Sequence, residues 1–259
     1  MGLITLTTDF GTGDWFIGAM KGVMISVSGR NRIVDITHDI PPGNILAGAF
    51  ALAQSYKYYP PKTIHVAIVD PGVGSDRPAI AVETRNFIFI GPDNGVLSLA
   101  LAKEEIEGIY RIENEALFCK PVSRTFHGRD IFAPVAAHLG REASIQDVGP
   151  TIQNHVRLPF PSVQIQGDLL IGEVIHIDRF GNCITNLPAD SVESAAAPRQ
   201  VVLYDGSICP VGKFYDEVAS GAPLALVGST DCLEIAVNGG RAADQLGMKV
   251  GSPVSLKVH

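Results

Sequence analysis

Acidic, basic and imidazole side chains that directly follow apolar runs are the groups of this chain best placed to do chemistry. The segment IVDPGVGSDR, residues 68–77, ends an apolar run in Asp70 and places Arg77 seven residues later. Its Pro and Gly residues can turn the chain back on itself and bring the carboxylate and the guanidinium together. Such a pair can close a loop as a structural ion pair or take part in catalysis, and this segment alone leaves both interpretations open.

Three further segments supply candidate groups. Asp9, in TTDFG, is followed by glycines that let a ligand approach the backbone, so its carboxylate could bind a ribose diol or could cap the next helix. His127, in TFHGRD, precedes a predicted helix, although an isolated His is more often a structural residue. In DRFGN, the Phe180 ring between Asp178 and Asn182 could stack on a nucleobase, but these residue types are also typical of a β-turn.

The composition is that of an ordinary globular protein. With 259 residues, of which 46% are hydrophobic, the chain can bury one large core or two smaller ones. The net charge of -7 and the scattered Lys and Arg residues disfavour a nucleic acid as partner. The sequence shows no basic leader and no apolar run of about 18 residues or more, so neither export nor a membrane partner is expected.

The four cysteines are widely spaced. No CxxC pair or other close metal-ligand spacing occurs among Cys119, Cys183, Cys209 and Cys232. This spacing fits reduced thiols better than a disulfide framework or a zinc site. We therefore expect a cytoplasmic protein without a metal site.

Residues 1–150 are expected to form an α/β domain with a mainly parallel sheet, because strand-like and helix-like runs alternate there. The run at 64–69 is apolar at every position except His65, which indicates a sheet covered on both faces. Strands are predicted at 3–7, 33–36, 64–69, 79–83 and 87–90, and helices capped by Asp14 and by Asn44 and over 95–103 and 131–139.

The residue pattern of the sequence changes after this domain. The segment GPTIQNHVRLPFPS, residues 149–162, has three prolines and little periodicity, so residues 151–162 are predicted to be a linker. Beyond it, residues 163–259 are predicted to form a smaller all-β domain, a barrel or a sandwich, because short apolar runs are separated by Gly, Asn and Asp turns. The strands predicted there are 163–165, 169–177, 201–204, 224–227, 233–237 and 254–258.

The order of the four motifs is more specific than any one of them. Taken together, TTDFG, DPGVG-x2-R, TFHGRD and DRFGN resemble the S-adenosylmethionine hydroxide adenosyltransferase family, whose relatives make fluorinated and chlorinated adenosines. ITHDIPPG at 36–43 and GS…LEIAVNGG at 228–240 extend the resemblance over nearly the whole chain. The resemblance implies S-adenosylmethionine as substrate, no separate cofactor, and a homotrimer whose sites lie between the N-terminal domain of one subunit and the C-terminal domain of its neighbour.

The resemblance also implies which residues are catalytic. The family's Asp, Arg and His are matched by Asp70, Arg77 and His127. Halogenating relatives carry neither this Asp nor this His, so the chain is expected to convert S-adenosylmethionine and water to adenosine and L-methionine. The water that attacks the ribose C5′ must be positioned and must lose a proton. Either Asp70 or His127 could accept that proton. A neutral His127 is the preferred base, with Asp70 orienting the water.

Several substrate contacts are implied by position in the family's motifs. Asp9 would bind the ribose hydroxyls. Asp178 and Asn182 would contact the methionine head group or the adenine. Phe180 and Phe214 would sandwich the adenine ring.

A second group of implied contacts lies near the C-terminus and beside His127. Ser229 would bind the substrate carboxylate, and the backbone at Asn238 and Gly239 would bind the adenine edge, while Phe126 is a further expected contact. Relatives often carry Ser-Gly or an Arg at 230–231 and an aromatic residue at 232, where this chain has Thr-Asp and Cys. No contact is therefore assigned at 230–232.

Three other hypotheses stay open from the sequence. A halogenase on the same scaffold is disfavoured because the Asp70 carboxylate would repel a halide. The chain could also bind adenosine or S-adenosylmethionine with little turnover, since a fold does not guarantee a rate. A metal hydrolase built on Asp9, His127 and Asp130 is the third hypothesis, although the sequence lacks HxH and HExxH spacing.

Overall fold

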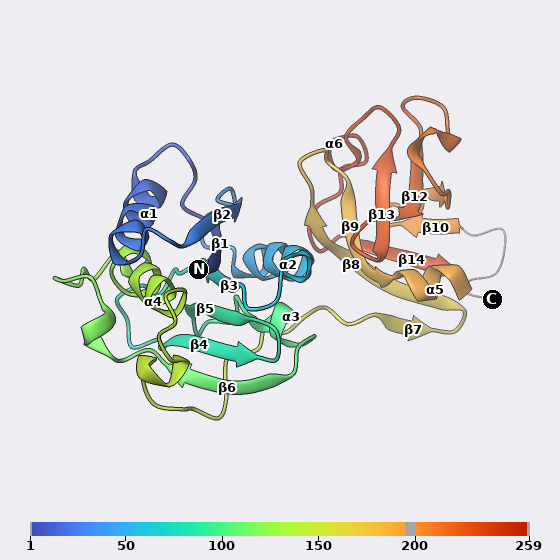
Figure 1. The fold of residues 1–259 in the computed structure, drawn as a ribbon. Coiled ribbons are helices and arrows are strands. Elements are labelled where there is room, and N and C mark those ends of the chain that lie inside the picture. Colours follow the sequence, from blue (N-terminus) through green and yellow to red (C-terminus); the bar gives the residue numbers. More distant parts are fainter. Residues whose placement is uncertain (1, 195–199, 258–259) are drawn as a thin grey trace. The chain divides into compact units, whose positions relative to one another are not determined.

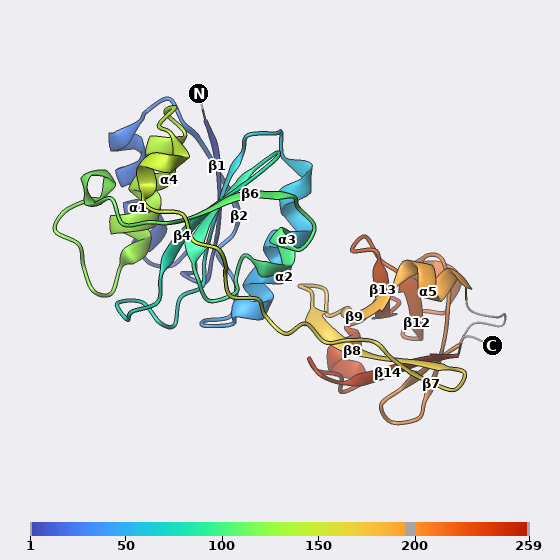
Figure 2. The same ribbon diagram turned by 90° about the horizontal axis from the view of Figure 1, so that it is seen from below.

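The computed structural model describes residues 2–194 and 200–257, which form two compact units that divide between residues 158 and 159 (Figures 1 and 2). The stretch predicted as a linker spans this division. Its first part, residues 151–158, belongs to unit 1. There the Leu158 N–H donates to the Ser98 hydroxyl at 3.2 Å, and the Val156 N–H donates to the Asp93 carboxylate at 2.7 Å. Within the described residues, no helix is both long enough and apolar enough to cross a membrane.

Unit 1 is built on a six-stranded sheet. Its strands are β1 Leu3–Thr8, β2 Arg32–Thr37, β3 Ile64–Ile68, β4 Ala79–Thr84, β5 Ile88–Pro92 and β6 Ile106–Arg111, in the spatial order β2-β1-β3-β5-β4-β6. The pairs β1–β2, β1–β3 and β3–β5 are parallel, and the pairs β4–β5 and β4–β6 are antiparallel. The prediction of a mainly parallel α/β sheet is therefore confirmed.

Helices cover both faces of this sheet. They are α1 Phe16–Val27, α2 Ile45–Ser55, α3 Ser98–Leu101 and α4 Ala133–Leu139. α1 and α4 lie on one face, and α2 and α3 lie on the other (Figure 2). Because side chains alternate along a strand, β3 sends Val66 and Ile68 into the core under α1 and α4, and Ala67 into the core under α2. This two-sided burial explains why the run at 64–69 is apolar except for His65, which is itself buried.

The two predicted helix caps have different outcomes. The side chain of Asn44 accepts a hydrogen bond from the Ala47 N–H at 3.0 Å, as predicted. Asp14 does not cap α1, because the helix begins one residue later than a cap at Asp14 requires, and Trp15 occupies the N-cap position without a side-chain hydrogen bond.

Two predicted helices begin later than expected. In the segment 95–103, Gly95 adopts a φ of +99° and its carbonyl accepts the Ser98 N–H, so a turn precedes the four-residue α3. In the segment 131–139, a π-helical turn at Gly128–Phe132 precedes α4, and Pro134 lies in the first turn of α4. Proline lacks an N–H donor and is tolerated in a first turn, which fits a new helix that begins at Ala133. Single 3-10 turns occur at Tyr56–Tyr58, Glu115–Leu117, Ile145–Val148 and Tyr215–Glu217.

Unit 2 is an antiparallel, nearly closed β-barrel, which confirms the predicted all-β domain. Its strands are β7 Gln164–Gln166, β8 Leu169–Ile177, β9 Cys183–Pro188, β10 Gln200–Leu203, β11 Ile208–Pro210, β12 Pro223–Val227, β13 Cys232–Val237 and β14 Pro253–Lys257, with short helices α5 Ala189–Ser194 and α6 Ala242–Gln245. The order is β11-β10-β14-β8-β9-β13-β12, with β7 paired to β8. A bridge between Val211 and Ala225 joins the two ends of this order. Residue 258 of the last predicted strand lies outside the described residues.

Candidate functional site

The predicted catalytic residues meet at one edge of the unit 1 sheet. Asp9 directly follows β1, Asp70 lies two residues after β3, and Arg77 lies two residues before the antiparallel strand β4. His127 directly precedes the π-helical turn. The carboxyl ends of parallel strands are where open α/β sheets bind ligands, so the topology gathers chemically active groups from three distant parts of the sequence.

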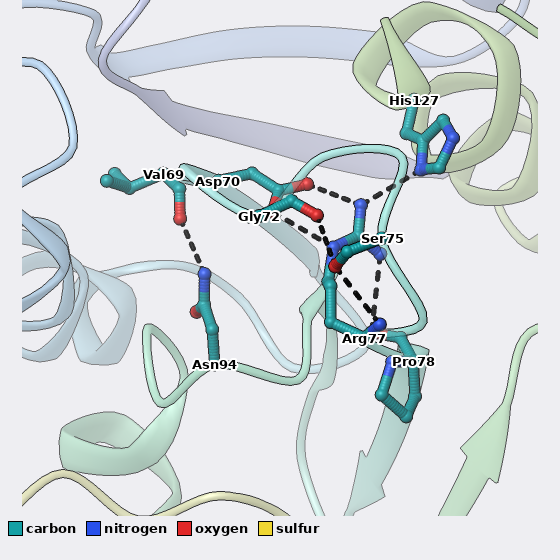
Figure 3. Close-up of polar contacts among 8 residues, drawn as sticks. All are labelled: Val69, Asp70, Gly72, Ser75, Arg77, Pro78, Asn94 and His127. Carbon is teal, nitrogen blue, oxygen red and sulfur yellow. Dashed lines mark hydrogen bonds and ion pairs between the residues drawn. The ribbon is translucent and has the colours of Figure 1, made fainter. Parts of the chain in front are cut away.

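Arg77 connects Asp70 and His127, and we call these three predicted catalytic residues the trio (Figure 3). Its Nε donates to Asp70 Oδ1 at 2.9 Å, and its Nη2 contacts Asp70 Oδ2, so the guanidinium and the carboxylate form a two-point pair. The same Nη2 lies 3.0 Å from Nδ1 of His127. The side chains of Asp70 and Arg77 are only 5% and 11% exposed. The structure therefore brings together all three predicted catalytic residues.

The hydrogen bond to Arg77 fixes the tautomer of His127. A guanidinium has only donors, so Nδ1 of His127 must accept, and the ring proton of the neutral imidazole then resides on Nε2. Burial, and next the positive charge of Arg77, hold the pKa of His127 below its ordinary value, and these effects outweigh the opposing charges of Asp70 and Asp130. His127 is therefore a neutral imidazole whose Nδ1 lone pair is already occupied.

Side-chain hydrogen bonds to backbone carbonyls and one close backbone approach hold the Asp70–Arg77 turn in place. The Ser75 hydroxyl donates to the Gly72 carbonyl at 2.7 Å, and the Asn94 side chain donates to the Val69 carbonyl at 2.8 Å (Figure 3). Gly74 has a φ of +79°, and a Cβ built there would lie 2.2 Å from the Arg124 carbonyl oxygen. Only glycine allows this close approach, which ties the Asp70 turn to the segment that leads into His127.

A pocket of about 400 Å³ lies beside the trio. It is lined by Asp9, Phe10, Phe16, Gly43, Ile68, Asp70, Pro71, Val73, Thr125, Phe126, His127 and Gly128. Asp9 does not cap a helix, and its Oδ2 instead accepts the Gly43 N–H at 2.8 Å. A larger hollow of about 720 Å³ lies against the first residues of β1, β3 and β5, and none of the predicted site residues line it.

Eight of the residues that line this pocket were not among the predicted site residues, and Phe10, Phe16 and Gly43 are three of them. Phe10 directly follows Asp9 and Gly43 closes the ITHDIPPG motif, so their positions beside recognised motif residues were the available signal. Phe16 falls within the helix predicted after Asp14, where an apolar residue is expected to face the core. Because it is the first residue of α1, its ring also reaches the pocket.

In unit 2, DRFGN forms the tight turn between β8 and β9. The Asn182 N–H and side-chain amide donate to the two oxygens of Asp178, at 2.9 and 3.1 Å. Phe180 stands at the tip with 74% of its surface exposed. Gly181 adopts a φ of +86° and packs against Arg241. The turn interpretation is thus confirmed, and the turn presents an aromatic ring to solvent.

The other unit 2 residues predicted to contact substrate are dispersed over three loops. Phe214 is 57% exposed and precedes the Tyr215–Glu217 turn. Ser229 lies in the turn between β12 and β13. Asn238 and Gly239 follow β13, and the Asn238 side chain donates to the Val218 carbonyl at 2.8 Å.

One buried acid of unit 2 was not predicted. Glu234 is 5% exposed, and its Oε1 accepts the Tyr215 hydroxyl at 2.7 Å. Burial, as the largest cause, raises the pKa of this carboxyl above its ordinary value. Burial, and next the same contact with Glu234, raise the pKa of Tyr215 to about 12. The bond fixes the segment next to Phe214.

The residues of the metal hypothesis do not assemble into a ligand set. Asp130 is fully buried, but its two oxygens accept from Nε and Nη2 of Arg129, at 2.6 and 3.0 Å. Among residues 2–194 and 200–257, no three His, Cys, Asp or Glu side chains form a group that could hold a metal ion. The arrangement instead suits the positioning of a polar nucleophile by Asp70 and His127.

Comparison with known proteins identifies the family. Residues 4–149 match the SAM hydroxide adenosyltransferase N-terminal domain, and residues 172–255 match the SAM hydroxide adenosyltransferase C-terminal domain. The chain is 41% identical to an (R)-S-adenosyl-L-methionine hydrolase of Salinispora tropica, over 96% of this chain and 95% of that protein. It is 35% identical to an uncharacterized conserved protein from Thermotoga maritima, whose crystal structure matches with a TM-score of 0.92 over 98% of this chain and 99% of that chain. A fluorinase of Actinoplanes sp. is 25% identical over 98% of this chain and 97% of its own length. The chain therefore belongs to the SAM hydroxide adenosyltransferase family, with fluorinases as more distant relatives.

Proposed function

We propose that this protein hydrolyses S-adenosyl-L-methionine to adenosine and L-methionine by attack of water at the ribose C5′. The observation that carries the proposal is the Asp70–Arg77–His127 trio beside a pocket that also contains Asp9. The similarity to the Salinispora tropica hydrolase over nearly the full chain supports the same reaction.

The substrate supplies its own leaving group, because methionine departs from a sulfonium as a neutral thioether. As the bond from the water oxygen to C5′ forms, the C5′–S bond breaks and its electron pair passes to sulfur. One proton of the water must then leave. The protein therefore has to orient the water, exclude competing solvent and accept a proton.

Asp70 is the proton acceptor in this proposal, in place of the His127 expected from sequence. Nδ1 of His127 has one lone pair, and the hydrogen bond from Arg77 occupies it. A carboxylate has about four acceptor positions, of which Arg77 uses two at Asp70. Asp70 can therefore accept from water, while the Nε2–H of His127 serves as a donor.

The remaining substrate contacts extend the proposal to both units. Asp9 binds the ribose hydroxyls, and Phe126 lines the pocket beside the reacting carbon. From unit 2, Phe180 and Phe214 enclose the adenine, and a further group contacts the adenine edge and the methionine head group. That group is Asp178, Asn182, Ser229, Asn238 and Gly239.

The assembly and the location of the protein are also part of the proposal. Sites formed by the N-terminal domain of one subunit and the C-terminal domain of its neighbour in a homotrimer would use both sets of residues. The family resemblance of the motifs supports this assembly. A cytoplasmic location stays a prediction of the sequence.

The test compares Asp70→Asn with Asp76→Asn, which alters an exposed carboxylate of the same turn. With S-adenosylmethionine and chloride both present, the unaltered protein and Asp76→Asn should form adenosine and methionine, with no halogenated adenosine. Asp70→Asn should lower kcat by about a hundredfold or more, the usual scale of a lost proton acceptor. Full activity of Asp70→Asn would reject the catalytic assignment, and a chlorinated product would favour the halogenase hypothesis.

A chelator tests whether the reaction needs a metal ion. We expect treatment with EDTA, followed by desalting, to leave the rate of adenosine formation unchanged. A rate lost on treatment and restored by a divalent cation would contradict the proposed role of Asp70 as the acceptor acting without a metal.

A further inference from the structure

Three phenylalanine rings form one wall of the unit 1 pocket. Phe10, Phe16 and Phe126 all line it. Their ring centroids lie 5.9 Å apart for Phe10 and Phe16, 6.0 Å for Phe10 and Phe126, and 5.1 Å for Phe16 and Phe126. We call these three residues the aromatic wall. Of the three, only Phe126 is a substrate contact in the proposed function.

Phe10 and Phe16 reach the pocket from the β1 side and Asp70 reaches it from the neighbouring strand β3, while Phe126 adjoins His127. Phe10 follows β1 and Phe16 begins the helix after it, whereas Asp70 and Arg77 lie between β3 and β4. In-line attack places the departing sulfur on the side of C5′ opposite to the water. With the ribose held at Asp9 and the water at Asp70, the sulfur lies near the β1 side of the pocket.

The charges around the pocket leave it receptive to a cation. Of the described side chains that line it, only Asp9 and Asp70 are carboxylates, and Asp70 is paired with Arg77. Behind the wall, the positive charge of Arg129 is balanced by the buried Asp130. Asp9 therefore leaves a net negative charge at the pocket, next to rings that are poorly exposed to water.

We propose that the aromatic wall binds the sulfonium of the substrate through cation–π attraction, mainly at Phe10 and Phe16. Ring faces carry partial negative charge and attract cations within about 6 Å, most strongly where water is excluded. The Arg129 guanidinium already lies 5.1 Å from the centroid of Phe126, so one cation position on that ring is taken. This inference rests on the proposed function, because it assumes a sulfonium substrate.

The wall distinguishes a sulfonium from a thioether. The reaction removes the positive charge from sulfur, so the methionine product no longer gains the cation–π attraction. S-adenosylhomocysteine, which has a neutral thioether at the same position, lacks it as well. Adenosine lacks the sulfur altogether and contacts only the ribose and adenine positions.

The experiment measures inhibition constants for two inert ligands. One is an analogue of S-adenosylmethionine in which a protonated methylamine replaces the sulfonium, and the other is S-adenosylhomocysteine. Phe16→Leu should weaken the cationic analogue about three- to thirtyfold, the range expected for a cation–π contact in a desolvated site. S-adenosylhomocysteine and adenosine should keep their affinities, and Phe160→Leu, outside the pocket, should change none of the three.

A ring-fluorinated phenylalanine at position 16 separates charge attraction from packing. Fluorine withdraws the negative charge from the ring face but preserves the ring shape, so this variant remains informative where Phe16→Leu fails to fold. We expect the cationic analogue alone to lose affinity as fluorine atoms are added. Equal losses for both ligands, or no loss with fluorination, would overturn the inference. Absence of adenosine formation by the unaltered protein would instead overturn the proposed function.

Discussion

At the scale of single residues, the number of hydrogen-bond acceptor positions on each side chain determines which residue can accept a proton from the water in the proposed mechanism. The one accepting nitrogen of neutral His127 is used by Arg77, whereas Asp70 keeps free lone-pair positions after its two bonds to the same guanidinium. In the proposed mechanism, Arg77 thus orients the carboxylate and occupies the accepting nitrogen of His127, which leaves Asp70 as the base. The ring of Phe132 lies 5.4 Å from the Arg77 guanidinium carbon and supports it from one side.

This assignment predicts the pH dependence of turnover. Burial and Arg77 lower the pKa of His127 below its ordinary value of 6.5, so the ring stays neutral at and above that pH. Protonation at Nδ1 would break the bond to Arg77, so activity should be retained at neutral pH and lost only as the pH falls through the lowered pKa. The measurement is kcat against pH. A rate that already falls as the pH drops from 8 toward 6.5 would contradict the assignment.

Two substitutions of His127 separate the functions of its nitrogens. His127→Asn keeps an acceptor near the Nδ1 position and lacks the Nε2–H donor, while His127→Gln keeps a polar group near Nε2. If the Arg77 contact dominates, His127→Asn should retain more activity than His127→Gln, and its kcat profile should lose the acid limb. The reverse order would show that the Nε2–H donor matters more.

The residue chemistry could be predicted from sequence only in part. The pairing of Asp70 with Arg77 followed from the turn between them, because the partners are close along the chain. His127 is 50 residues from Arg77, so only the family resemblance placed it there. The tautomer depends on which ring nitrogen faces Arg77, and no sequence pattern encodes that. Phe16 was missed because an apolar residue in a helix gives the same signal whether it faces a core or a pocket.

At the scale of elements, the site depends on two turns that approach each other closely. The turn after β3 carries Asp70, and the segment before the π-helical turn carries His127. They meet where Gly74 lies against the Arg124 carbonyl. A shift of either turn would change the bond between Arg77 and His127 without removing any catalytic group.

Gly74→Ala tests this contact. A Cβ at position 74 would lie 2.2 Å from the Arg124 oxygen, at a φ of +79° that disfavours alanine. We expect the free energy of unfolding to fall by about 1–3 kcal/mol and kcat to fall with it, because the turn must move. Gly72→Ala is the matched control, since its Cβ would make an ordinary contact of 3.4 Å with the Ser75 hydroxyl. Urea unfolding and steady-state rates compare the two, and equal behaviour would show that the contact is unimportant.

The elements themselves were predictable where one strong signal decided the outcome. The predominantly apolar run of β3 and the Asn44 cap of α2 gave correct elements. β6, with the sequence IEGIYR, was missed because its polar and glycine residues suit an antiparallel strand near the sheet edge rather than a buried run. β9 was missed because its Asn and Thr residues resemble a continuation of the preceding turn.

At the scale of the whole molecule, the proposed substrate contacts are divided between two folded units. The trio and Asp9 belong to unit 1, while Phe180 and Phe214 belong to unit 2 and are 74% and 57% exposed. Large exposed aromatic side chains are common at binding surfaces. The change from alternating helices and strands to short strands predicted this two-part organisation. The sequence pattern alone held no information on which copies of the units share a site.

Mixing two inactive variants tests the shared site. Asp70→Asn impairs unit 1, and Phe214→Ala impairs the proposed adenine contact of unit 2. If each site combines units from neighbouring subunits of a trimer, every mixed trimer has one intact site, so random co-assembly should restore about a quarter of full activity. Activity is measured after co-expression and purification. No recovery, with mixed trimers demonstrated by differently tagged chains, would mean that each site lies within one subunit.

The origin of the new oxygen atom shows whether water itself attacks C5′. In a single turnover with enzyme in excess, in water enriched in oxygen-18, direct attack of water places the label in the 5′ hydroxyl of adenosine and none in methionine. Mass spectrometry of the first-turnover products reads both positions. Unlabelled adenosine would contradict the account, because the oxygen would then have come from the protein, as it would if the Asp70 carboxylate attacked C5′ itself.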